Sequence, residues 1–168
     1  MTTAIIILQV ISLLFLYLAI CSLGRLAKQH IDLSSYEYAV SFADNFDKID
    51  SPYIVLKQGD KEYMFIIDTC CSVGMISADV LKELKYKVVG KPKPIIGIEG
   101  VAKKQNHLLT EFIYEDKTLP VLLTDYDCTE SLKRISKDIG TQIDGVLGSC
   151  FIKSQDMVID YKARMIYI

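Results

Sequence analysis

Short apolar runs separated by turn residues fill the chain after Pro52, and this pattern is what most constrains the fold. Residues 53–56 and 63–67 flank Gly59-Asp60, which predicts a β-hairpin because glycine tolerates the positive φ that a tight turn needs. Later apolar runs follow in the same manner, at residues 95–101, 107–114, 119–124, 157–160 and 165–168. Short strands bounded by turns predict an all-β domain.

Two segments between these runs have helical spacing instead. Ser77 precedes residues 78–84, and a serine at this place can cap the first turn of a short helix. Between Thr129 and Gly140 the apolar residues recur at helical intervals, and a glycine is a common helix end. We therefore expect a short helix at each place.

An uncharged apolar segment lies at the other end of the chain. Residues 4–23 contain no Lys, Arg, Asp or Glu, and a helix of about 20 apolar residues spans the bilayer core. We expect one N-terminal transmembrane helix. A cleaved signal peptide is the alternative, which the lack of a basic residue in positions 1–3 disfavours. Because Arg25 and Lys28 follow the segment, the positive-inside rule places the rest of the chain in the cytoplasm.

These features divide the chain into three expected parts: an anchor over residues 1–24, a juxtamembrane linker over 25–50 with one strand around residues 38–42, and one domain over 51–168. The last part is long enough for one hydrophobic core. The 51% hydrophobic content excludes intrinsic disorder. A net charge of -2 without a dense basic stripe argues against nucleic acid as a partner.

One carboxylate is placed unlike the others. Asp68 directly follows the apolar run 63–67 and is followed by Thr69, Cys70, Cys71 and Ser72. The chain thus delivers an acidic side chain from a buried strand into a loop. Taken alone, such an aspartate is more often a capping or loop residue than a catalyst.

The order of the motifs changes this interpretation. A hairpin leads to Asp68-Thr69-Cys70-Cys71-Ser72, and a short helix, a glycine-bearing hairpin at 95–106, the run Val146-Leu147-Gly148 and a closing hairpin follow. This order resembles the retropepsin-like aspartic proteases, in which an apolar strand ends in Asp-Thr/Ser-Gly and a later signature places two apolar residues before a glycine. The resemblance covers about residues 51–168.

The resemblance implies a closed, all-β barrel with one or two short helices, which supplies half of an active site. Asp68 would be the catalytic residue, and a homodimer would bring two copies of it together across a two-fold axis. Two adjacent carboxylates share one proton and can activate a water against a peptide or protein substrate. The resemblance also implies supporting residues in the active-site loop, a flap and the second signature, namely Thr69, Cys70 and Ser72, then Gly97, Ile98 and Gly100, then Val146, Leu147 and Gly148.

Cys70 departs from the family pattern, which has glycine there. If the backbone at this position needs a positive φ, a residue other than glycine costs about 1 kcal/mol or more. Two alternatives to an active membrane-anchored endopeptidase follow. One is an inactive dimerisation or peptide-binding module with the same fold, and the other is a protease gated by oxidation of Cys70 or Cys71.

Cysteine chemistry is a competing interpretation of this loop. A cysteine nucleophile needs a histidine base, and the chain offers His30 in the expected linker and His107 in an expected strand. The cysteines also lack the paired Cys-x-x-Cys spacing of a zinc site. We therefore expect neither a metal nor a cofactor, and interpret the thiols of Cys70 and Cys71 as loop side chains.

Overall fold

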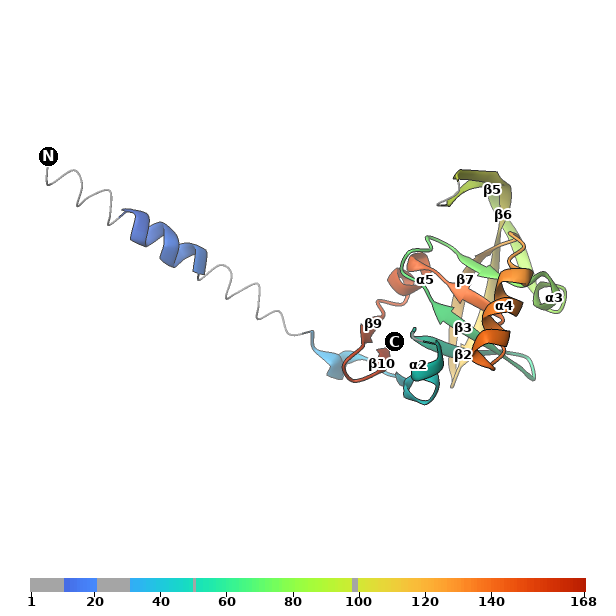
Figure 1. Cartoon of the computed structure of the whole chain (residues 1–168), viewed down its shortest axis with the longest axis horizontal. Helices are drawn as coiled ribbons and strands as arrows, with labels where there is room; N and C mark the ends of the chain where they lie inside the picture. The colour runs from blue at the N-terminus through green and yellow to red at the C-terminus, as the bar shows by residue number, and fades with distance from the viewer. Residues whose placement is uncertain (1–10, 21–30, 50, 98–99) are drawn as a thin grey trace, which may run out of the picture. The chain divides into compact units, whose positions relative to one another are not determined.

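The structure is a computed structural model of the whole chain (Figure 1), which describes residues 11–20, 31–49, 51–97 and 100–168. The chain divides into two compact units, Met1–Ser35 and Tyr36–Ile168. In the first unit, residues 11–20 are helical and Leu33–Ser35 form a 3-10 turn. The Asp32 carboxylate accepts a hydrogen bond from the Ser34 N–H at 3.0 Å, which fixes the start of that turn.

The predicted membrane location is wrong. Of the expected span, the structure describes residues 11–20, which are helical. Residues 4–10 and 21–23 of the expected span lie outside the described residues, as do Arg25 and Lys28. Within the described ranges, no helix has both the length and the apolar character needed to cross a membrane. We therefore withdraw the single-pass anchor and the cytoplasmic side assigned from it.

The second unit is mostly β structure with short helices. Its strands are β1 (Ala39–Ser41), β2 (Tyr53–Gln58), β3 (Lys61–Ile67), β4 (Gly74–Ile76), β5 (Tyr86–Gly97), β6 (Gly100–Tyr114), β7 (Lys117–Thr124), β8 (Gly145–Leu147), β9 (Val158–Asp160) and β10 (Met165–Tyr167). Its helices are α2 (Ala43–Ile49), α3 (Ala78–Leu81), α4 (Thr129–Ile139) and α5 (Ser149–Ser154).

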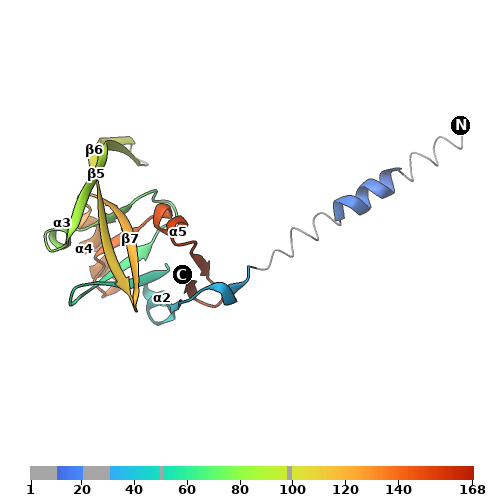
Figure 2. The ribbon, with the colours of Figure 1, turned by 180° about the vertical axis from the view of Figure 1, so that it is seen from behind.

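The larger sheet closes on itself. Its strand order is β2-β3-β8-β4-β7-β6-β5, and β2 also pairs with β6 through Lys57 and Ile113. Strands β2, β3, β8, β4, β7 and β6 therefore form a closed ring, with β5 attached outside to β6. This confirms the predicted closed barrel, in a unit that is mostly β rather than all-β and contains α2, α3, α4 and α5 where one or two short helices were expected. Both views show the outer part of the β5–β6 hairpin extending away from the barrel (Figures 1 and 2).

The alternation of β3 explains how the barrel places its core. Tyr63, Phe65 and Ile67 are buried, while the residues between them are half-buried. The Phe65 ring meets the Phe112 ring edge-on with centroids 5.2 Å apart, a favourable geometry for two aromatic rings. The predicted β2–β3 hairpin is confirmed, and its turn contains Gly59 at a φ of 62°. This packing fixes the direction in which β3 ends.

Local signals account for the helix ends. The Ser77 hydroxyl accepts a hydrogen bond from the Val80 N–H at 3.2 Å and caps α3. Gly140 ends α4 with a φ of 68°. The stretch expected to be a linker contributes β1 and α2 to the second unit, where β1 pairs with β10 and β10 with β9. These three strands form a small separate sheet.

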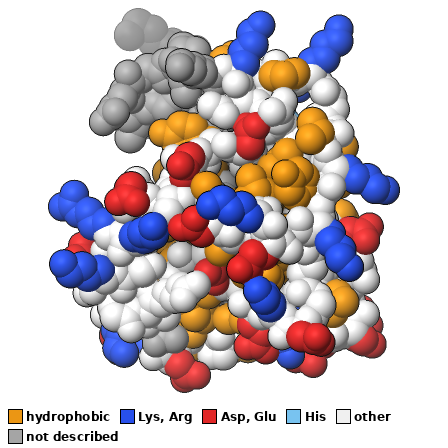
Figure 3. Space-filling view, turned by 90° about the vertical axis from the view of Figure 1, so that its right-hand side faces the viewer, with side chains coloured by type: hydrophobic (Ala, Val, Ile, Leu, Met, Phe, Trp, Pro, Cys, Tyr) orange, Lys and Arg blue, Asp and Glu red, His pale blue; other side chains and the backbone are white. Residues whose placement is uncertain are grey.

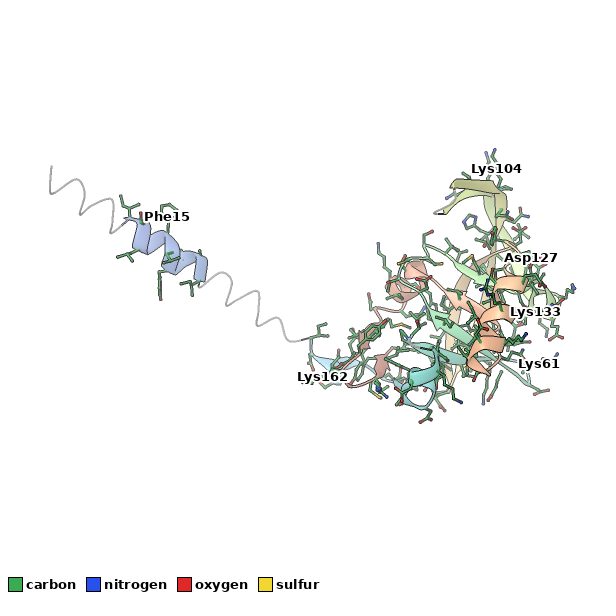
Figure 4. All side chains as sticks on the ribbon, in the orientation of Figure 1. Phe15, Lys61, Lys104, Asp127, Lys133 and Lys162 are labelled. Atoms are coloured by element: carbon green, nitrogen blue, oxygen red, sulfur yellow. The ribbon has the colours of Figure 1, made fainter. Side chains whose placement is uncertain are left out.

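Charged side chains of both signs are interspersed on the side of this unit that carries α3 and α4 (Figure 3). Lys61 binds Glu83 at 2.7 Å and Lys133 binds Asp79 at 3.5 Å, and both lysines are labelled in Figure 4. All four side chains are exposed, so each pair contributes little to stability. The barrel is held by its core and strand pairing, not by these ion pairs.

Candidate active site

The two sequence signatures meet at one end of the barrel. Strand β3 pairs in parallel with β8, with Ile67 opposite Leu147. The Asp68 N–H, one residue beyond β3, donates to the Leu147 carbonyl at 2.9 Å. Because parallel strands end at the same edge of a sheet, the loop that starts at Asp68 lies beside the loop that starts at Gly148.

Backbone hydrogen bonds lock these two loops together. The Ser149 N–H donates to the Cys71 carbonyl at 2.7 Å, and the Cys150 N–H donates to the Ser72 carbonyl at 3.0 Å. A Cβ on Gly148 would lie 2.6 Å from the Cys71 carbonyl oxygen, closer than side chains approach a backbone. Gly148 is therefore needed for the close contact that holds the Asp68 loop.

The Asp68 carboxylate is held at both oxygens by its own loop. The Cys70 N–H donates to Oδ1 at 2.8 Å, and the Cys71 thiol donates to Oδ2 at 3.3 Å. Asp68 is half-buried. Burial, with the hydrogen bond to Asp68 and its negative charge, raises the pKa of the Cys71 thiol to about 12. The thiol therefore keeps its proton and acts as a donor, and the carboxylate plane is fixed.

Cys70 carries no left-handed backbone strain. Within the described part of the chain, the residues other than glycine with positive φ are Glu115, Asp156 and Arg164. The cost of about 1 kcal/mol anticipated for a cysteine in place of glycine therefore does not arise. The Cys70 side chain is exposed beside Asp68. We therefore expect this cysteine to affect binding at this surface rather than the stability of the fold.

The remaining predicted site residues lie in two regions, the end of the barrel around the Asp68 loop and the outer end of the β5–β6 hairpin. Thr69 and Ser72 are exposed in the Asp68 loop. The three residues of the second signature, Val146, Leu147 and Gly148, lie beside that loop in β8 and directly after it. Gly97 and Gly100 end β5 and begin β6 at the outer end of the hairpin, and Ile98 lies outside the described residues. The structure thus brings the loop and the second signature together and sets the glycines of the expected flap on the hairpin.

A cysteine or metal mechanism finds little support in the described residues. The raised pKa of Cys71 disfavours the thiolate that a nucleophile needs, and no hydrogen bond joins Cys70 or Cys71 to His107. His30 lies outside the described residues. No group of three or more His, Cys, Asp or Glu that could hold a metal ion occurs in residues 11–20, 31–49, 51–97 and 100–168.

A second aspartate, which the sequence analysis assigned no role, is the more deeply buried one. Asp144 is 6% exposed, and its carboxylate accepts the Met64 N–H at 2.8 Å and the Gln142 amide at 2.6 Å. It lines a hollow of about 490 Å³ between α3 and α4, to which Asp68 does not contribute. The hydrogen bond from the Met64 N–H to Asp144 holds the start of β8 against the middle of β3. The sequence signal for this structural role is an aspartate directly before a glycine and a short apolar strand.

Comparisons with known proteins assign no family to this chain. No family model matches it, and no curated protein matches it. Among solved structures, the EIAV protease complexed with the inhibitor HBY-793 matches with a TM-score of 0.42 and 13% sequence identity. The match covers 63% of this chain and 88% of that chain. At this level of similarity it identifies neither a family nor an activity.

Proposed function

We propose that this chain is a retropepsin-like aspartic endopeptidase that acts as a homodimer and hydrolyses peptide bonds with two Asp68 carboxylates. The observation that carries the proposal is the arrangement of Asp68. A buried strand ends at this residue, and its two oxygens are oriented by the Cys70 N–H and the Cys71 thiol. The loop is locked to the loop after β8. Such orientation is what an acid or base catalyst requires.

The reaction needs a second carboxylate, which a second copy of the chain supplies. When two Asp68 side chains face each other, one is ionised and one is protonated because two adjacent negative charges repel. The ionised carboxylate accepts a proton from a water molecule as the water oxygen attacks the carbonyl carbon of the substrate. The protonated carboxyl gives its proton to the carbonyl oxygen, where negative charge develops. The C–N bond of the tetrahedral intermediate then breaks: the first carboxyl passes the proton taken from water to the leaving nitrogen, and a hydroxyl of the intermediate returns a proton to the second carboxylate. The apparent pKa values of this reaction belong to the pair.

The other predicted residues take supporting roles in the proposal. Thr69 is exposed next to Asp68, where it would contact the partner subunit and hold the paired loops. The outer end of the β5–β6 hairpin extends from the barrel (Figure 1) and would close over an extended peptide, excluding water from the reacting bond. The substrate class is therefore a peptide or an extended protein segment.

Cys70 favours one alternative, an inactive peptide-binding or dimerisation module. Its exposed side chain lies beside Asp68, where the substrate and the partner subunit would pack. A shift of about 1 Å in a reacting group can reduce a rate by about a hundredfold. Activity of the natural chain, compared with a Cys70→Gly variant, separates the two functions.

The test is hydrolysis of a peptide mixture by the full-length chain, with products identified by mass spectrometry from about pH 3 to about pH 7. We expect cleavage that falls about a thousandfold or more in Asp68→Asn. Asp60→Asn is the matched control, because Asp60 is an exposed turn aspartate at the other end of β3. Cleavage unaffected by Asp68→Asn would refute the proposal.

Two further comparisons in the same assay distinguish the proposed protease from the binding module and from the protease gated by oxidation. Cleavage that occurs only after Cys70→Gly would make the natural chain a binding module. Cleavage by the natural chain that requires a thiol reductant would show oxidative gating through the loop cysteines. Equal cleavage with and without reductant would exclude that gating.

A further inference from the structure

The Cys71 side chain is fixed in place by its backbone on both sides. Its N–H donates to the Asp68 carbonyl at 3.2 Å, and its carbonyl accepts from the Ser149 N–H at 2.7 Å. The thiol is half-buried and lies 3.3 Å from Asp68 Oδ2. This contact is therefore part of the loop's structure and does not depend on a mobile side chain.

The direction of the hydrogen bond follows from chemistry. An ionised carboxylate is an acceptor only, so the thiol must donate. Burial and the Asp68 charge raise the pKa of the thiol to about 12, so the proton is present at every pH at which carboxylates work. A donor on Oδ2 interacts more strongly with the ionised carboxylate than with the protonated one.

Resting on the proposed function, we propose that Cys71 is a positioning residue, whose thiol favours the ionised state of Asp68 and extends hydrolysis towards lower pH. It acts through Asp68, and its thiol takes no part in the proton transfers of the proposed reaction. The thiol is a weak donor, so we expect its effect on the pH dependence to be modest and to change with the strength of the donor at this position. Alanine at this position removes the donor, and serine replaces it with a stronger one.

The kinetic test compares the pH dependence of kcat/KM for the full-length chain, Cys71→Ala and Cys71→Ser. We expect the acid limb of Cys71→Ala to move to higher pH, with about a threefold to tenfold loss at the acid end. Cys71→Ser should return the limb to its original position or to lower pH. Cys150→Ala is the matched control, because Cys150 is half-buried after the neighbouring signature and its backbone N–H remains.

A second measurement is independent of hydrolysis. With ¹³C-labelled aspartate, the Asp68 carboxyl signal is assigned by its loss in Asp68→Asn and then titrated in the natural chain and both Cys71 variants. A titration midpoint that rises in Cys71→Ala and returns in Cys71→Ser supports the proposal. Superimposed titration curves, or a pH–rate profile that serine does not restore, would overturn it. A chain that cleaves nothing refutes the proposed function, while the titration still decides the contact between thiol and carboxylate.

Discussion

Asp68 and Asp144 lie at opposite ends of the same parallel strand pair and have different environments. Asp144 precedes β8 and is buried, with its carboxylate bonded to the Met64 N–H in the middle of β3. Asp68 follows β3, is half-buried and is held by donors from its own loop. One carboxylate attaches two strands to each other, and the other is oriented at an open surface.

The comparison separates a structural carboxylate from the one that we propose to be catalytic. Donors from β3 and from Gln142 bind the two Asp144 oxygens, so removing the side chain leaves the partly buried Met64 N–H without its acceptor. Of the two donors to Asp68, the Cys70 N–H belongs to an exposed residue, where water can replace the carboxylate, and the Cys71 thiol is half-buried. The fold therefore depends on Asp144, whereas the proposed chemistry depends on Asp68.

Gly148→Ala tests whether the Asp68 loop needs its close contact with β8. The added Cβ would lie 2.6 Å from the Cys71 carbonyl oxygen, so the loop must shift. We expect a loss of about 1 to 3 kcal/mol in the free energy of unfolding and about a hundredfold loss of hydrolysis. Urea denaturation and peptide cleavage measure the two effects. Ser149→Ala, which alters an exposed neighbour, is the control, and equal behaviour of both variants would contradict the account.

Asp144→Ala tests the comparison between Asp144 and Asp68 through the free energy of unfolding. The Met64 N–H loses its carboxylate acceptor in a partly buried setting, which costs about 1 to 3 kcal/mol. Asp68→Ala, in contrast, should change the free energy of unfolding by about 0.5 kcal/mol or less. Both values come from urea denaturation of the full-length chain. An Asp68 variant that is the less stable of the two would reverse the assigned roles.

Alkaline pH should destabilise the fold through two thiols, those of Cys71 and Cys128. Burial raises the pKa of Cys128 to about 11, and burial with Asp68 raises that of Cys71 to about 12. The unfolded chain loses these protons near the ordinary value of 9.0, while the folded chain keeps them, so their stabilisation is present below pH 9 and is lost as pH rises through 11 and 12. The urea midpoint under reducing conditions should fall between pH 8 and about pH 10.5, and less so in Cys128→Ala. An identical fall in that variant would exclude a contribution from Cys128.

Cys70→Gly has the smallest expected effect on the fold. Cys70 is exposed and has no positive φ, so the variant mainly gains freedom in the unfolded state and loses about 0.5 to 1 kcal/mol of stability. The N–H that binds Asp68 remains, and hydrolysis should stay within about threefold of the natural chain. A large gain in hydrolysis would show that the thiol obstructs the site. Calorimetry and peptide cleavage provide the two measurements.

Local signals in the sequence predict much of the barrel. Gly59 predicts the β2–β3 hairpin, Ser77 the start of α3 and Gly140 the end of α4, because each acts on its own neighbours. The length of the β5–β6 hairpin was underestimated. Pro92 and Pro94 lie within β5, which tolerates them because, among the described strands, it pairs with β6 alone and is an edge strand.

The rest depends on contacts between distant segments. Nothing near Asp68 in the sequence indicates that Cys71 donates to its carboxylate or that Gly148 packs against the Cys71 carbonyl. Likewise β1 pairs with β10 at the far end of the chain, so a stretch without periodicity became part of the second unit. The membrane expectation depended on apolar composition, and no described helix has the length and apolar character that it requires.

Subunit mixing tests the central claim, a site shared between two copies of Asp68. The natural chain and Asp68→Asn are unfolded together in equal amounts, refolded, and compared with the natural chain at the same total concentration. A site that needs one Asp68 from each subunit predicts about one quarter of the hydrolysis rate, because about one quarter of the dimers hold two natural chains. A rate of about one half would show that each chain acts alone and would contradict the account.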